Sequence, residues 1–275
     1  MRPMAVLLAM GLGAFPACAW ATTVYLFGQV GDRPVFASID RDGKELSGWY
    51  VYDAVGKSLQ LKGTVESSGA FVLDESPSEH APGSHGGKTG RFTGTVKGND
   101  WSGTWSKPDG TGSRAFSLSE SRDGLAAATG KFHCEVKDSV VSGTGENTLR
   151  GRLEYSFDIE LAKGEVKGFQ AAYNGKYSDH NDQSCAIGME DLVRVKSDNG
   201  IVLQTRSDDP PHGPVPGCTI RILGTAGTLY VGMGDATSKD DNVCRQSEDR
   251  MFCSPQAWWP DLLLDRRTLK CKTVG

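Results

Sequence analysis

The chain has 275 residues, of which 30 are Lys or Arg and 34 are Asp or Glu, so its formal net charge is −4. A mildly acidic chain without a basic stripe is a poor candidate for binding nucleic acid or anionic lipid, and a cationic partner would suit it better. The length is sufficient for two domains of ordinary size.

The N-terminus has the features of an export signal. Arg2 supplies a positive charge, residues 5–14 are apolar, and Ala19-Trp20-Ala21 has the Ala-x-Ala form of a cleavage site. We predict that residues 1–21 are removed after Ala21, that the protein is periplasmic or secreted, and that losing Arg2 moves the net charge from −4 to −5. No later stretch reaches the roughly 18 apolar residues of a membrane-spanning helix. Two alternatives stay open, a lipid anchor on Cys18 and a buried N-terminal helix.

Residues 22–120 contain no cysteine and predict short β-strands spaced by about ten residues. Turn residues such as Gly31-Asp32 and Gly98-Asn99-Asp100 separate the strands. The predicted strands are 23–30, 34–40, 45–52, 58–65, 69–75, 90–97, 100–106 and 113–119. The 3.6-residue periodicity of helices is absent, so we expect an all-β domain.

Several of these strands carry a glycine on their more apolar face, with large residues two positions away. Two such sets are Phe92, Gly94 and Val96, and then Trp101, Gly103 and Trp105. Glycine weakens a strand, so it usually marks a bend or a close approach of two backbones. Because inward glycines let a sheet coil sharply, we predict a curled meander or a small up-and-down barrel over residues 22–120.

A long polar loop, 76–89, interrupts the strands and contains His80 and His85. Loops of this length are often functional, so both histidines are candidates for partner binding. A flexible histidine pair makes a poor preformed metal site. The end of the loop is similar to a phosphate-binding loop, but Pro82 stands where that motif needs glycine, so we predict no nucleotide site.

Residues 121–130 change in composition and are predicted to be a linker to a second β domain, 131–275. Its predicted strands are 131–138, 150–161, 166–173, 191–196, 200–205, 218–223, 227–233 and 261–265. Irregular segments are expected at 174–189, 206–217 and 234–260. The regular repeat of the first half does not continue, so we expect a separate fold.

Six cysteines lie in this second half. They are Cys134, Cys185, Cys218, Cys244, Cys253 and Cys271. An even number of cysteines in an exported chain predicts disulfides, here three at most, with 15 possible connectivities that the sequence leaves open. No Cys-x-x-Cys pair occurs, so we predict no zinc site.

Other polar and aromatic clusters give weaker signals. Asp179 and Asp182 are weak calcium candidates, although the order of calcium-loop ligands is missing. Trp258 and Trp259 could stack on sugar rings or anchor a protein interface, and the alternative is that they pack on the core and a disulfide. No nucleophile or zinc-protease motif occurs, so we predict no enzyme and no cofactor. Because carboxylate pairs of glycosidases have no fixed spacing, a secreted hydrolase stays an alternative.

The first half resembles a recurrent β-repeat domain of exported bacterial proteins of unassigned function. The residues that carry this resemblance are Ser47-Gly48-Trp49-Tyr50-Val51-Tyr52, Leu59-Gln60-Leu61-Lys62-Gly63, Phe71-Val72-Leu73-Asp74-Glu75, Phe92-Thr93-Gly94 and Gly103-Thr104-Trp105. The resemblance covers about 100 residues and implies a fold but almost no activity.

A looser resemblance connects the whole chain to periplasmic lysozyme inhibitors and immunity proteins against peptidoglycan hydrolases. Those proteins block the enzyme with a Ser-Gly…Tyr loop, and Ser47, Gly48 and Tyr50 are the comparable residues here, with the Tyr one position closer. The resemblance implies a protein that occludes a hydrolase active site. The alternative is a carbohydrate-binding or envelope-structural module that binds peptidoglycan or another glycan without inhibiting an enzyme.

Overall fold

The computed structural model describes residues 22–55, 57–77, 87–120, 125, 128–142, 149–177, 183–195, 200–205, 219–225, 227–233 and 260–274. These residues form β-strands and one 3₁₀ turn, so the all-β prediction is confirmed. None of the helical structure within these ranges is long and apolar enough to cross a membrane.

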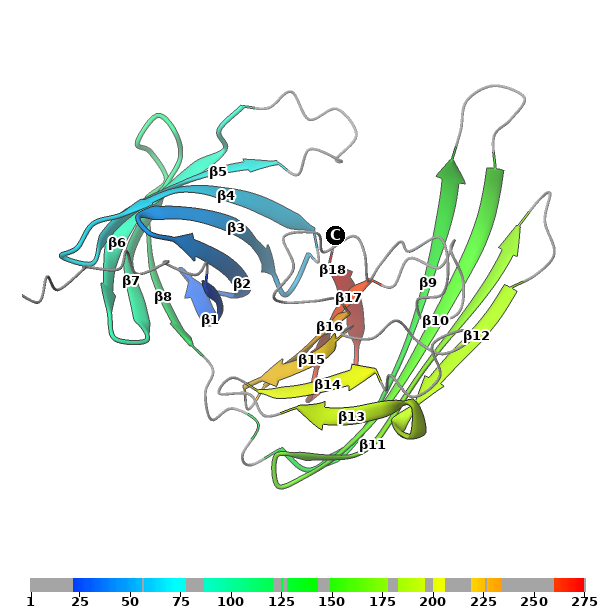
Figure 1. Cartoon of the computed structure of the whole chain (residues 1–275). Helices are drawn as coiled ribbons and strands as arrows, with labels where there is room; N and C mark the ends of the chain where they lie inside the picture. Colours follow the sequence, from blue (N-terminus) through cyan, green and yellow to red (C-terminus); the bar gives the residue numbers. More distant parts are fainter. Residues whose placement is uncertain are drawn as a thin grey trace, which may run out of the picture.

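The first half is a closed barrel of eight antiparallel strands in chain order, with β1 pairing β8 (Figure 1). The barrel strands are β1 (Thr22–Val30), β2 (Arg33–Asp42), β3 (Glu45–Tyr52), β4 (Ser58–Val65), β5 (Ala70–Pro77), β6 (Gly90–Lys97), β7 (Asp100–Ser106) and β8 (Arg114–Glu120). All eight predicted strands are present, with ends shifted by two residues or fewer. The small up-and-down barrel is therefore confirmed.

The inward glycines lie where the backbones of neighbouring strands approach closely. A Cβ atom added to Gly63 would overlap the carbonyl oxygen of Val72 on β5, and one added to Gly103 would overlap that of Thr93 on β6. At these points the backbone of the neighbouring strand lies where a side chain would begin, so only glycine fits. Glycine is required because the small barrel coils tightly, as the sequence predicted.

Aromatic and aliphatic side chains fill the barrel. Edge-to-face and tilted contacts join Tyr50 to Phe92, Phe92 to Phe116, and Phe71 to both Phe116 and Trp101. The void that remains among these apolar side chains is about 20 Å³, which is roughly the space of one water molecule. The barrel interior formed by the described strands therefore has no room for a ligand.

The second half contains two further antiparallel sheets. The four-stranded sheet has the order β12-β11-β10-β9, and the six-stranded sheet runs from β13 to β18 in chain order. Their strands are β9 (Gly130–Ser142), β10 (Leu149–Ala162), β11 (Glu165–Tyr177), β12 (Gln183–Gly188), β13 (Leu192–Val195), β14 (Ile201–Thr205), β15 (Thr219–Gly224), β16 (Thr228–Met233), β17 (Asp261–Asp265) and β18 (Cys271–Val274), with the 3₁₀ turn η2 (Met189–Asp191) between β12 and β13.

Two predictions for this half were incomplete. The segment 174–189 was expected to be irregular, yet β11 continues to Tyr177 and β12 occupies Gln183–Gly188. The short strand β18 at the C-terminus was not predicted. In both cases pairing with a neighbouring strand supplies the order that the local sequence does not signal.

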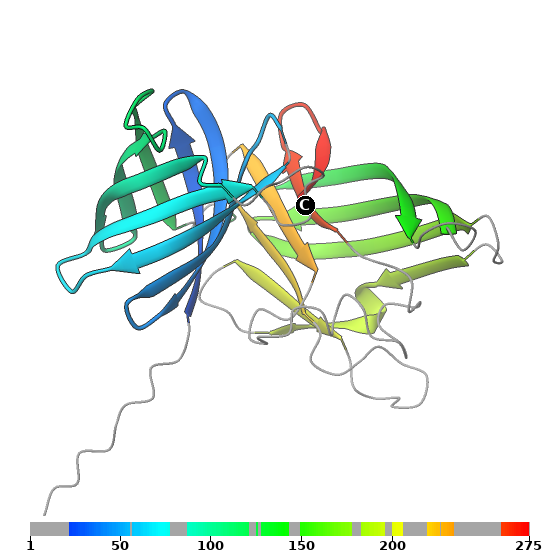
Figure 2. The same cartoon turned by 90° about the horizontal axis from the view of Figure 1, so that it is seen from above.

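The six-stranded sheet is a middle layer (Figures 1 and 2). One of its faces packs on the four-stranded sheet in a shared apolar core that includes Ile222, Val231 and Leu264. Its other face packs on the outside of barrel strands β1 to β3 through residues such as Tyr230 and Leu263. Because both faces are covered, adjacent residues of β17 are buried together, which is typical of a strand inside a layered structure.

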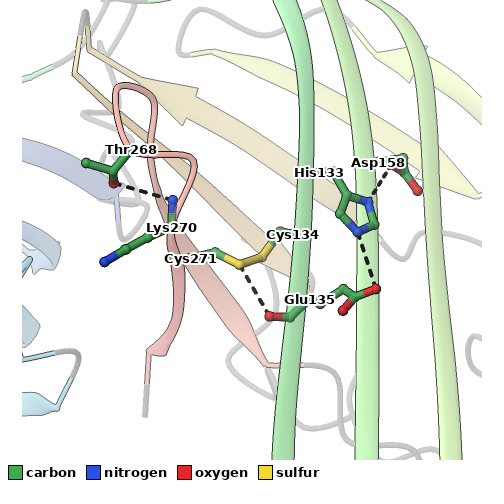
Figure 3. The surroundings of a disulfide bond; sticks show 7 residues. All are labelled: His133, Cys134, Glu135, Asp158, Thr268, Lys270 and Cys271. Atoms are coloured by element: carbon green, nitrogen blue, oxygen red, sulfur yellow. Dashed lines mark hydrogen bonds and ion pairs between the residues drawn. A yellow bond between two sulfur atoms is a disulfide. The ribbon is translucent and has the colours of Figure 1, made fainter.

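A disulfide joins Cys134 of β9 to Cys271 of β18, so the second half is disulfide-braced as predicted (Figure 3). It connects the four-stranded sheet to the last strand of the six-stranded sheet. The predicted disulfide bonding of Cys185, Cys218, Cys244 and Cys253 lies outside what the structure describes.

Candidate binding surface

The string Ser47-Gly48-Trp49-Tyr50 lies in strand β3, and its side chains serve two different cores. Tyr50 points into the barrel and is only 2% exposed, so its side chain is not available to a partner in this conformation. Trp49 points outward to Tyr230 of the six-stranded sheet, with ring centroids 6.2 Å apart, and also packs on Phe36. Ser47 is exposed on the strand. A packing role therefore accounts for the aromatic residues of this string.

The other residues predicted to bind a partner lie outside the described residues. These are His80, His85, Trp258 and Trp259, and the weak calcium candidates Asp179 and Asp182 share this status. Within the described ranges, no group of three His, Cys, Asp or Glu side chains is arranged to hold a metal ion.

A buried carboxyl, Glu75, ties one end of the barrel together. From the sequence it was named only as the last residue of the string Phe71-Val72-Leu73-Asp74-Glu75, without a role. It is 3% exposed and accepts hydrogen bonds from Tyr50 Oη, from Trp105 Nε1 at 2.9 Å and from Thr89 Oγ1 at 2.6 Å. Burial and the adjacent Glu75 raise the pKa of Tyr50 far above its ordinary value, so the hydroxyl stays protonated and donates. Three neutral donors satisfy the carboxyl, which indicates a structural role in closing the barrel.

The outer face of the four-stranded sheet carries charged side chains in cross-strand pairs. Lys131 pairs with Glu160 at 3.2 Å, His133 with Asp158 at 2.8 Å, and Lys137 with Glu154 at 3.2 Å. Each pair joins directly opposed residues of β9 and β10. Opposite charges in such positions stabilise a sheet modestly and fix its register.

A shallow hollow of about 140 Å³ opens on this same face. The side chains of Glu135, Lys137, Glu154, Ser156 and Asn174 line it, and Val136 and Tyr155, whose side chains point to the other face, complete it. Among the lining residues Ser156 has a small side chain, and it lies beside the longer side chains of its cross-strand neighbour Glu135 and of Glu154 two residues before it.

His133, two residues before Glu135 on β9, lies between two carboxylates (Figure 3). Its Nδ1 is 2.8 Å from Oδ1 of Asp158, and its Nε2 is 3.4 Å from Oε1 of Glu135. The hydrogen bond to Asp158 raises the pKa of His133 above its ordinary 6.5, and Glu135 acts in the same direction. The protonated imidazole is thus favoured on this surface.

The sequence contained a usable signal for this surface. Strand residues 131–137 read Lys-Phe-His-Cys-Glu-Val-Lys, in which charged or titratable residues alternate with residues of the core. The same alternation runs through residues 152–160. An alternation of two predicts a solvated polar face, but which strands lie side by side, and hence the hollow, depends on the sheet order.

Taken together, these features define an all-β protein with a filled barrel, a disulfide-braced pair of sheets and a polar hollow on one sheet face. Comparison with protein-family models, with curated proteins and with solved structures finds no match for the chain.

Proposed function

We propose that this protein is an exported binding protein that acts by surface fit, and that its partner is a peptidoglycan hydrolase of the lysozyme type whose active site it occludes. The observation that carries the proposal is the polar hollow on the outer face of β9 to β11. Ser156, Asn174 and Lys137 offer hydrogen-bond donors there, and Glu135 and Glu154 offer acceptors.

These groups are suited to a sugar-binding cleft because such a cleft presents carboxylates and groups that hydrogen-bond hydroxyls. They stand on strands that pair with neighbours, so little backbone order has to be gained on binding. The net charge of −5 expected after export favours a basic enzyme as partner.

The alternative function is binding of glycan without inhibition, since the same donors and acceptors suit sugar hydroxyls. An experiment separates the two functions. The protein lacking residues 1–21 is mixed with a basic lysozyme-type muramidase, and sedimentation measures a 1:1 complex while turbidity of a peptidoglycan suspension measures the rate. An inhibitor forms the complex and lowers the rate, whereas a glycan-binding module pellets with peptidoglycan in the absence of enzyme.

A pair of matched variants connects the result to the hollow. Ser156→Leu fills the hollow, and Ser102→Leu places the same side chain on the exposed outer face of barrel strand β7. We expect inhibition to be lost in the first variant and kept in the second. Inhibition that survives Ser156→Leu unchanged would assign the activity to another surface.

A further inference from the structure

We propose that the turn after β3 is a proton-operated latch, which is held on the six-stranded sheet more firmly in acid than at neutral pH. The latch consists of Asp53 and Ala54 on the barrel side and of Thr228, Asp265 and Lys272 on the sheet side. The proposal rests on the contacts between these two layers and is independent of the proposed function.

The turn lies against strands β16 to β18 of the middle sheet (Figures 1 and 2). Lys272 Nζ on β18 donates to the carbonyl oxygen of Asp53 at 2.8 Å and to that of Ala54 at 2.6 Å. Thr228 Oγ1 on β16 donates to Oδ2 of Asp53 at 3.1 Å. Because these bonds join residues 175 or more positions apart, they fasten one layer to another.

The Asp53 carboxyl has an unfavourable setting for its ionised form. The charged groups that face it are Asp265 of β17, which lies directly across from Thr228, and Lys272 of β18. β16 presents the neutral hydroxyl of Thr228, and β2 accepts the backbone N–H of Asp53 at the carbonyl of Pro34. Since Lys272 directs two N–H donors to backbone carbonyls, the hydrogen bond to the carboxylate comes from an uncharged donor.

This setting links docking of the turn to a proton. Burial and then Asp265 raise the pKa of Asp53 above 3.8, and the opposing effects of Thr228 and Lys272 are too small to cancel them. In a turn that has left the sheet, the carboxyl is solvated and its pKa returns toward the ordinary value. The docked turn therefore binds the proton more tightly. Docking is strongest below the ordinary pKa and weakens as pH rises through the docked value.

The rest of the junction does not share this dependence. Its core contains Phe36, Trp49 and Tyr230, with the ring centroid of Tyr230 4.3 Å from that of Phe36 and 6.2 Å from that of Trp49. These side chains carry neither carboxyl nor imidazole groups. We therefore expect the barrel and the sheet to stay packed at neutral pH while the turn alone is released more often.

The test measures how fast the ammonium protons of Lys272 exchange with water. These protons are bonded to the carbonyls of the turn only while the turn is docked. Nuclear magnetic resonance of the 15N-labelled protein gives the rate from about pH 3 to about pH 6, a range that brackets the titration of a carboxyl with a raised pKa. Dividing by the rate in Asp53→Asn at the same pH removes the intrinsic pH dependence of exchange.

We expect this ratio to be near 1 at the acid end and to rise at least about threefold at the upper end, because only the wild type loses a proton from the turn. A ratio that stays at 1 would overturn the proposal. A ratio that falls below 1 would also overturn it, since direct attraction between the Asp53 carboxylate and Lys272 slows exchange instead of opening the turn.

Two further variants check the assignment. Asp42→Asn makes the same chemical change at an exposed acid at the other end of β3, where Asp42 lies across from Glu45, and it should keep the wild-type pH dependence. Thr228→Val removes the donor to the ionised carboxylate. Referred to the same variant with Asp53→Asn, it should show a larger rise than the wild type. A smaller rise in Thr228→Val, or loss of the rise in Asp42→Asn, would contradict the latch.

Discussion

The disulfide between Cys134 and Cys271 gives a prediction whose magnitude follows from its position. Replacing both residues by Ala removes the cross-link without leaving a free thiol. The two cysteines are 137 residues apart, so the bond closes a large loop in the unfolded chain. The loop-closure entropy for that length corresponds to about 5 kcal/mol of stability at 25 °C.

Urea unfolding followed by far-ultraviolet circular dichroism measures the loss. Because the stabilisation is assigned to restriction of the unfolded chain, the uncrosslinked variant should expose more surface on unfolding. We therefore expect both a lower free energy of unfolding and a larger dependence of that free energy on urea, the m-value. Loss of native contacts alone would lower the free energy and leave the m-value unchanged.

A control separates the bond from its surroundings. Glu135→Gln leaves the disulfide intact and changes the exposed side chain that follows Cys134 on β9, so it should alter stability by less than about 0.5 kcal/mol. A double alanine variant that loses under about 1 kcal/mol with an unchanged m-value would refute the reasoning. Such a result would mean that other constraints already close most of the loop in the unfolded chain.

Six other substitutions, at five positions, test particular contacts. Gly63→Ala should cost about 3 kcal/mol in urea unfolding because its Cβ overlaps the backbone of β5, whereas Gly98→Ala, with open space around it and φ of 61°, should cost about 1–2 kcal/mol. Glu75→Gln should cost under about 1 kcal/mol, because the new amide oxygen can accept from Tyr50 and Trp105 while the amide nitrogen donates to Thr89. Glu75→Leu leaves these three donors without an acceptor and should cost about 3 kcal/mol or more. Lys272→Met should lower the melting temperature, because Lys272 Nζ donates to the carbonyls of Asp53 at 2.8 Å and Ala54 at 2.6 Å. Burial raises the pKa of Asp53 above 3.8, so this carboxyl lowers the stability of the fold as pH rises from 3.8 through its folded pKa. Asp53→Asn keeps an acceptor for Thr228 and does not ionise. Urea midpoints measured against pH should therefore show the variant gaining stability relative to the wild type over that pH range.

The barrel could be predicted because its rules are local. Alternation of two placed Phe92 and Trp101 on the inner face, turn residues separated the strands, and the glycines indicated tight coiling. Each of these signals lies within one hairpin. The binding role expected for Ser47, Gly48 and Tyr50 came instead from the resemblance to lysozyme inhibitors, and a short string of residues does not show whether it is exposed or lies between two cores.

The layering of the second half could not be predicted, because it depends on contacts between residues far apart in sequence. Trp49 on the outside of the barrel contacts Tyr230 of the six-stranded sheet, and Lys272 donates hydrogen bonds to the turn after β3. The strand β18, only four residues long, is ordered by pairing with β17 and by the disulfide to β9. Single-sequence reasoning has no access to such pairings.

The C-terminal strand β18 connects all three layers of the molecule. Cys271 is bonded to the four-stranded sheet, Lys272 holds the barrel turn at Asp53 and Ala54, and Val274 packs in the core between the barrel and the six-stranded sheet. Strands β14 to β17 of the middle sheet are largely buried on both faces, whereas the outer face of the four-stranded sheet is exposed. The outer face of β9 to β11 carries the polar hollow, and Cys134 immediately precedes Glu135 on β9. The disulfide therefore fixes the strand that carries Glu135 of the hollow, so the bond that braces the fold also holds the proposed binding surface in place.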